Sequence, residues 1–203
     1  MNKVTINNSF ITPSKIVCVG RNYVEHIAEL GNEVSENMVV FIKPNSAISN
    51  ELLSNLDEPL HFEGEICFLY QQGAFTAIGF GLDLTKRQLQ STLKEKGLPW
   101  ERAKSFDGSA VFSKFVSIAN IESNFDIKLS INNQLKQEGS IMDMIYKPLA
   151  ILQEIQSFMT LVDGDIVMTG TPKGVGVINA GDSFTGSISN NGENILSTTW
   201  VAQ

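Results

Sequence analysis

Two glutamates, Glu63 and Glu65, stand two positions apart in an apolar segment over residues 61–69. Because side chains alternate between the two faces of a strand, both carboxylates would point to one face. Two carboxylates at the edge of an apolar surface repel each other and resist loss of water unless a cation lies between them. A divalent metal ion bound between the two carboxylates would offset their repulsion and their loss of water. On their own, the two glutamates also fit an edge strand whose carboxylates point to water.

Asp83 is a third carboxylate that could join such a site. It lies near the end of the segment 77–84, in which its face otherwise carries only Gly79 and Gly81, so we expect bare backbone to leave room for a bound group. Taken alone, Asp83 would also be an ordinary aspartate near the start of a helix. Three carboxylates with open coordination positions suit Mg²⁺.

His26 and Glu29 are spaced i, i+3 on a short helix expected over residues 23–30, so their side chains should be neighbours. A glutamate that holds one imidazole nitrogen raises the basicity of the other nitrogen. This is the arrangement that a general base needs in order to activate water. The same pair also occurs by chance on the surfaces of helices.

Further polar side chains could contact an anionic substrate. Arg87 and Gln90 follow Asp83 at i+4 and i+7 on one helical stripe, where Arg87 could bind a substrate carboxylate. Lys104 has aromatic and small neighbours in the segment 100–108, where a lysine can be partly buried against an anion. An ordinary surface lysine would fit that position as well.

Other kinds of site are disfavoured by the sequence. The glycine-rich segment 169–176 lacks the Gly-Lys-Ser/Thr ending of a P-loop and the third glycine of a dinucleotide fingerprint. Cys18 and Cys67 lie in apolar runs typical of buried thiols, and two histidines without a Cys-x-x-Cys motif give little from which to build a zinc site. The acidic pair Asp163 and Asp165 lacks the spacing of a calcium loop and predicts a turn.

The composition predicts one folded domain over residues 1–203. Hydrophobic residues make up 42% of the chain and charged residues 18%, which excludes a disordered or collagen-like protein. The net charge of −7 argues against nucleic acid as a partner. The sequence shows no secretory leader and no apolar stretch of membrane-spanning length, so we expect a cytoplasmic protein that does not bind membranes.

Short apolar runs separated by glycines predict more strand than helix. Three helices are expected: residues 23–30 capped by Asn22, a second beginning after Thr85, which caps it with Gln88 completing the capping box, and ending at Gly97, and a third over 148–159 that buries Ile151, Ile155 and Phe158. Asn191-Gly192 is typical of a tight hairpin turn. The expected strands are residues 15–20, 39–43, 62–70, 77–84, 125–131, 165–169, 183–189 and 195–201.

Together these segments resemble the fumarylacetoacetate hydrolase family in its short, single-domain form, which includes acylpyruvases, oxaloacetate decarboxylases and diene-dioate isomerases. The resembling motifs follow the family's order from about residue 15 to residue 177. They include Gly20-Arg21-Asn22-Tyr23, Phe41-Ile42-Lys43-Pro44, Phe62-Glu63-Gly64-Glu65, Leu82-Asp83-Leu84-Thr85, Gly97-Leu98-Pro99-Trp100, Gln137-Glu138-Gly139-Ser140 and the segment 169–176.

The resemblance implies a mixed, mainly β fold, a β roll with a few short helices, that forms a homodimer. It also implies a mobile lid that carries a catalytic His26/Glu29 dyad. The implied Mg²⁺ or Mn²⁺ ligands are Glu63, Glu65 and Asp83, and the implied substrate pocket is lined by Lys104, Arg87, Gln90 and Thr171.

The implied substrate is a small 2-oxo acid that chelates the metal through its carboxylate and 2-oxo oxygen, which favours a pyruvate enolate. We expect first the hydrolysis of acylpyruvates such as acetylpyruvate or fumarylpyruvate, with His26 deprotonating water and Lys104 stabilising the oxyanion. Decarboxylation of oxaloacetate or isomerisation of 2-hydroxyhepta-2,4-diene-1,7-dioate would use the same enolate. A noncatalytic metal-dependent binder of small acids is a further alternative.

Two departures from the family pattern stand out. The connection over residues 71–76 is shorter than the family usually has, which predicts a cut-down hairpin between the strands of Glu65 and Asp83. The segment after Phe106 lacks a proline that is often found there in the family. The sequence therefore does not determine the structure of the pocket wall or which substrate side chain the pocket accepts.

Overall fold

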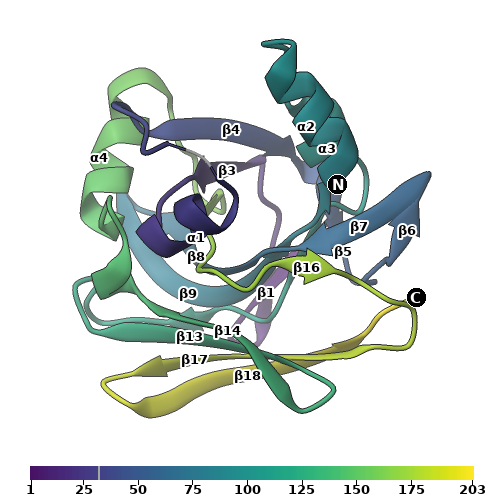
Figure 1. Cartoon of the computed structure of the whole chain (residues 1–203). Helices are drawn as coiled ribbons and strands as arrows, with labels where there is room; N and C mark the ends of the chain where they lie inside the picture. Colours follow the sequence, from purple (N-terminus) through teal and green to yellow (C-terminus); the bar gives the residue numbers. More distant parts are fainter. Residues whose placement is uncertain (32) are drawn as a thin grey trace.

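The computed structural model describes residues 1–31 and 33–203, and strands are the main regular structure of the described residues. Figure 1 shows a strongly curved sheet and a second sheet formed by β13, β14, β17 and β18. In this view α4 lies at the left, α2 and α3 lie at the upper right, and α1 lies in the middle. The predicted mainly β fold is confirmed.

The large sheet has eight strands, seven of them in the order β4-β3-β15-β8-β9-β11-β5, with β12 pairing to β9. The β3–β15 and β11–β5 pairs are parallel, and the others are antiparallel. The strands are β3 (Lys15–Gly20), β4 (Val39–Pro44), β5 (Ile48–Ser49), β8 (Gly64–Gln71), β9 (Ala74–Asp83), β11 (Ala110–Phe112), β12 (Val116–Ser117) and β15 (Ile166–Met168).

The second sheet packs against the large one and closes the main core. It is antiparallel, in the order β14 (Gln134–Ser140), β13 (Phe125–Ile131), β17 (Ser183–Asn190) and β18 (Glu193–Val201). Alternate residues of β13 are buried, as a strand with one covered face requires. Phe80 of β9 meets Trp200 of β18 with ring centroids 6.1 Å apart, so the two layers share one apolar interior.

Short strands complete the β structure. One small sheet pairs β1 (Val4–Ile6) with β2 (Ser9–Ile11). Another has the order β10 (Thr85–Lys86), β7 (Glu58–Phe62) and β16 (Gly176–Val177), and β6 (Asn55–Leu56) also pairs with β7.

The helices are short. They are α1 (Val24–Glu29), α2 (Arg87–Glu95), α3 (Glu101–Lys104) and α4 (Pro148–Phe158), with single 3₁₀ turns η1 (Asn45–Ala47) and η2 (Ile141–Asp143). Among the described residues, none of these helices is both long and apolar enough to cross a bilayer. Helix α4 buries Ile151 and Ile155 as predicted, but Phe158 is 56% exposed because it is the last residue of the helix.

Two predicted helix caps are wrong, because longer-range partners take the capping side chains. Neither α1 nor α2 has a side-chain hydrogen bond at its N-cap. Asn22 instead donates to the carbonyl of Thr169 at 2.8 Å and accepts from the Tyr146 N–H at 2.7 Å. It thereby ties the start of α1 to the end of β15.

The predicted strand over residues 62–70 is interrupted at Glu63, which lies between β7 and β8. Two predicted tight turns are confirmed by paired left-handed backbone conformations. Asn191 and Gly192 have φ of 50° and 83° between β17 and β18, and Gln72 and Gly73 have φ of 52° and 87° between β8 and β9. The connection over residues 71–76 is therefore a two-residue hairpin turn, which brings β8 and β9 directly together.

Asp165 joins the start of β15 to the chain that enters β3. Its carboxylate accepts hydrogen bonds from the N–H and hydroxyl of Ser14, the N–H and ammonium of Lys15 and the N–H of Val162. Burial opposes its charge, but these hydrogen bonds outweigh burial and lower the pKa of Asp165 below its usual value.

Replacing Asp165 with asparagine should lower the free energy of unfolding by about 2 kcal/mol near pH 7. A pKa that is lower in the folded state stabilises the protein above the unfolded-state value of about 4, and this contribution is lost as the pH falls through the lowered pKa. Urea unfolding at pH 7 and pH 3 should therefore show that the difference in the free energy of unfolding between the unmutated protein and the Asp165→Asn variant is smaller at pH 3. Asp163→Asn is the control, because this exposed carboxylate accepts one hydrogen bond, from Gln72. Equal losses in both variants would contradict the assigned role of Asp165.

Candidate metal and substrate site

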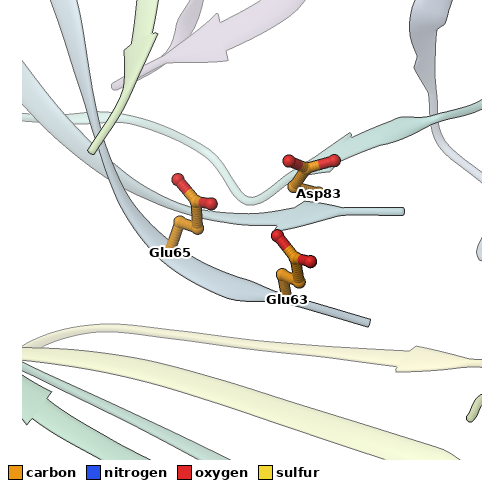
Figure 2. A group of neighbouring side chains, drawn as sticks. All are labelled: Glu63, Glu65 and Asp83. Atoms are coloured by element: carbon orange, nitrogen blue, oxygen red, sulfur yellow. The ribbon is translucent and has the colours of Figure 1, made fainter. Parts of the chain in front are cut away.

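The three predicted metal ligands converge at the open end of the β8–β9 hairpin. Glu63 immediately precedes β8, Glu65 lies in β8, and Asp83 is the last residue of β9. Glu65 pairs with Gly81, two residues before Asp83, so the strand register itself brings the carboxylates together. One oxygen of each group lies within 4.8 Å of the others, and Figure 2 shows the carboxyl groups facing a common space. All three residues are buried.

The glycines beside Asp83 serve packing beneath the carboxylates rather than leaving room for a ligand, which corrects the expectation from the sequence. A Cβ atom on Gly81 would lie 2.5 Å from Cys67 Sγ, and one on Gly79 would lie 2.9 Å from the ring of Phe115. Side chains of the core therefore occupy the space that the two glycines leave.

Glu63 and Asp83 are paired with buried cations. Lys104 Nζ lies 2.8 Å from Glu63 Oε2 and 2.9 Å from Asp83 Oδ2. Arg87 also contacts Glu63, and Lys43 Nζ lies 2.9 Å from Asp83 Oδ1. Burial opposes the charge of Glu63, but Lys104 and Arg87 outweigh it and lower the pKa of that carboxyl. Burial likewise opposes the charge of Lys104, yet Asp83 and Glu63 raise its pKa.

Among the described residues, no cationic side chain forms an ion pair with Glu65, in contrast to Glu63 and Asp83. Burial, followed by the charges of Asp83 and Glu63, raises the pKa of Glu65 well above its usual value. The N–H of Gly170, 2.7 Å from Glu65 Oε2, offsets this only in part. Three buried carboxylates, one of them short of positive charge, form a donor set that fits a hard divalent cation such as Mg²⁺ or Mn²⁺.

The predicted substrate residues line the same cavity as the carboxylates, with a volume of about 40 Å³. Arg87 donates to Gln90 Oε1 at 2.7 Å, and the Thr171 hydroxyl donates to the carbonyl of Gly64 at 2.9 Å. Eight of the nine predicted site residues line this cavity: Glu63, Glu65, Asp83, Arg87, Gln90, Lys104, Thr171 and His26.

Glu29 is the ninth predicted residue, and it lies behind His26. His26 Nδ1 is 3.1 Å from Glu29 Oε2, while Glu29 Oε1 accepts a hydrogen bond from the N–H of Gly174 at 2.9 Å. His26 is buried in the cavity wall, and α1 links it to the turn that carries Gly174. The contact between His26 and Glu29 leaves Nε2 as the imidazole nitrogen available for proton transfer.

Two further buried residues belong to this site, and neither was predicted from the sequence. Lys43 is fully buried, and its ammonium contacts Asp83 and the carbonyl of Lys104. Gln137 donates to the Thr171 hydroxyl at 2.8 Å and accepts from the N–H of Gly64 at 2.8 Å. Both residues stand in motifs that carried the family resemblance. For Lys43, the sequence signal was a charged side chain inside the apolar run of β4.

Comparisons with known proteins agree with this geometry. The family model described as fumarylacetoacetate (FAA) hydrolase C-terminal matches residues 15–197. The oxaloacetate tautomerase YcgM of Escherichia coli (strain K12) is 38% identical over 195 residues, covering 85% of this chain and 87% of that protein.

Solved structures share the fold along almost the whole chain. A candidate fumarylacetoacetate isomerase/hydrolase from Oleispira antarctica superposes with a TM-score of 0.91 at 34% identity and covers 100% of both chains. The fumarylpyruvate hydrolase of Pseudomonas aeruginosa, solved with Mn²⁺ and pyruvate, gives a TM-score of 0.88 at 26% identity and covers 99% of this chain and 95% of that one. The chain therefore belongs to the fumarylacetoacetate hydrolase family of enzymes.

Proposed function

We propose that this protein is a divalent-metal-dependent enzyme that interconverts the keto and enol forms of oxaloacetate. The observation that carries the proposal is the single cavity in which three buried carboxylates, Lys104 and His26 converge. The similarity to the E. coli oxaloacetate tautomerase supports oxaloacetate as the substrate. The residues assigned to the metal are Glu63, Glu65 and Asp83, with Mg²⁺ or Mn²⁺ as the ion.

The bound ion would supply Lewis-acid polarisation of the 2-oxo group of the substrate. His26 would accept the proton from the carbon between the 2-oxo group and the second carboxylate, and Glu29 would hold its imidazole in the required orientation and stabilise the charge that it gains. The ammonium of Lys104 would stabilise the negative charge that develops on the 2-oxo oxygen. Return of a proton to that oxygen completes the enol.

A second candidate is hydrolysis of the C–C bond of acylpyruvates, the activity expected first from the sequence. The specific observation that favours it is the His26–Glu29 contact, since this dyad suits deprotonation of an attacking water. The similarity to the fumarylpyruvate hydrolase of P. aeruginosa also supports it. Oxaloacetate decarboxylation and the isomerisation of the diene-dioate stay open on the same site. The homodimer and the cytoplasmic location also stay predictions.

A substrate panel tests the proposal. Oxaloacetate, acetylpyruvate, fumarylpyruvate and 2-hydroxyhepta-2,4-diene-1,7-dioate would each be assayed with Mg²⁺, with Mn²⁺ and with a chelator. We expect metal-dependent acceleration of the keto–enol exchange of oxaloacetate, followed by the enol absorbance in the ultraviolet. Faster cleavage of an acylpyruvate than exchange of oxaloacetate would favour the second candidate. No acceleration of any of the four reactions would favour a noncatalytic binder.

A further inference from the structure

Gln137 is a buried amide on β14, whose other residues are half-buried or exposed. Burying an amide costs free energy unless its hydrogen bonds are made. A methionine would fill the same space without that cost. The amide at this position therefore indicates a role that depends on the hydrogen bonds it makes.

These hydrogen bonds join the metal side of the cavity to the turn that follows β15. The side-chain oxygen of Gln137 accepts from the N–H of Gly64 at 2.8 Å. Its side-chain nitrogen donates to the Thr171 hydroxyl and to the carbonyl of Pro172, each at 2.8 Å. The Thr171 hydroxyl in turn donates to the carbonyl of Gly64 at 2.9 Å, which closes a ring of buried contacts.

Gly64 lies between two of the residues assigned to the metal, Glu63 and Glu65. A Cβ atom on Gly64 would lie 2.9 Å from the side-chain oxygen of Gln137, so glycine allows the amide to approach this closely. Glu63 and Glu65 are also held by hydrogen bonds of their own. We therefore expect the affinity for the metal to depend little on Gln137.

The turn that carries Thr171 rests on the backbone of β14 next to Gln137. Gly174 has φ of 99°, and a Cβ atom on it would overlap the carbonyl of Lys136. This close contact between backbones does not involve the amide of Gln137. Loss of the amide should therefore release the Thr171 hydroxyl and leave the turn in place.

We propose that Gln137 is a positioning residue that orients the Thr171 hydroxyl toward the carboxylate with which the substrate chelates the metal. The inference rests on the proposed function, in which that carboxylate and the 2-oxo oxygen bind at the metal. Thr171 lines the cavity, and its contact with Gly64 places its hydroxyl at the metal end. Because Gln137 donates to the oxygen of this hydroxyl, the proton is left to be donated. The carbonyl of Gly64 accepts it in this structure, and the substrate carboxylate would accept it in the complex.

The test measures the binding of oxalate to the Mg²⁺-loaded protein by calorimetry, because oxalate provides the chelating group alone. Gln137→Met keeps the length of the side chain and removes its hydrogen bonds. We expect this variant to raise the Kd for oxalate about tenfold, and the KM for oxaloacetate in parallel. The Kd for Mn²⁺ should change less than about threefold. Gln134→Met, the same substitution at an exposed position of β14, is the matched control and should change none of these values.

A double variant separates positioning from a merely structural role. Thr171→Val keeps the shape of the side chain, loses the hydroxyl, and should raise the Kd for oxalate at least as much as Gln137→Met does. If Gln137 acts through Thr171, adding Gln137→Met to Thr171→Val should raise the Kd less than about twofold further. The same rise in both backgrounds would overturn the inference. Gln137→Asn, one carbon shorter, should show the same dependence on Thr171 and serves as the second variant if Gln137→Met does not fold.

The outcomes distinguish this inference from the proposed function. An unchanged Kd for oxalate in Gln137→Met or in Thr171→Val would overturn the positioning role and leave the proposed function intact. An unmutated protein that binds oxalate with Mg²⁺ but does not accelerate the exchange of oxaloacetate would overturn the proposed function and leave the positioning role intact. Failure of the unmutated, Mg²⁺-loaded protein to bind oxalate would overturn both.

Discussion

The Glu65→Gln variant is expected to lose the stabilisation that Mg²⁺ or Mn²⁺ gives the unmutated protein, together with the metal-dependent activity. Metal at 100 times its Kd should stabilise the unmutated protein by about 2.7 kcal/mol, and the variant should gain almost none of this. Activity should fall by more than the roughly 10–100-fold that loss of an outer-shell partner costs a metal site. Thermal unfolding with and without metal measures the first effect.

The same variant should fold normally in the presence of a chelator. Burial and the neighbouring carboxylates raise the pKa of Glu65, so a neutral side chain of the same shape removes an unfavourable charge. The amide oxygen can still accept the hydrogen bond from Gly170. Glu138→Gln, a half-exposed glutamate that pairs with Lys128 on β13, is the control and should respond to metal as the unmutated protein does. Full metal stabilisation of the Glu65 variant would contradict the assigned ligand set.

The second large effect is expected from His26→Gln. If His26 transfers the proton, the substitution should lower kcat by about 10²–10⁴-fold, because a positioned general base contributes that much to a proton-transfer step. Metal affinity should change little, since His26 contacts Glu29 rather than any of the three carboxylates. Steady-state kinetics and titration with Mn²⁺ measure the two quantities separately.

Glu25→Gln provides a control on the same helix. Its exposed carboxylate pairs with Lys173 at the surface and does not line the cavity. We expect kcat to stay within a factor of about two of the unmutated value, because exposed ion pairs contribute little. A His26 variant that keeps full kcat, or that loses metal affinity together with kcat, would contradict its assignment as the base.

Much of the fold follows from local sequence signals. The apolar run over residues 125–131 and the Asn191-Gly192 turn predicted β13 and the β17–β18 hairpin, because side-chain pattern and turn chemistry are local properties. Strand β14 was not predicted, since its sequence Gln134–Ser140 is mostly polar. It is placed by hairpin pairing with the preceding strand β13, an interaction between strands that single-residue propensities do not contain.

The site was predictable as a set of residue types, but its network of contacts was not. Carboxylate spacing and the family resemblance indicated Glu63, Glu65 and Asp83, which converge as expected. The buried ion pair between Lys43 and Asp83 spans forty positions in the sequence and depends on where β4 runs. Asn22 and Thr85 looked like helix caps because capping motifs are local, whereas their actual partners come from remote segments.

The assigned metal site is tested most directly by an anomalous difference map from a crystal of this protein soaked in Mn²⁺. We expect one strong peak bounded by carboxylate oxygens of Glu63, Glu65 and Asp83, at the roughly 2.0–2.2 Å typical of such small divalent ions. A peak at another place, or no peak while Lys104 stays bonded to Glu63 and Asp83, would contradict the assigned ligand set.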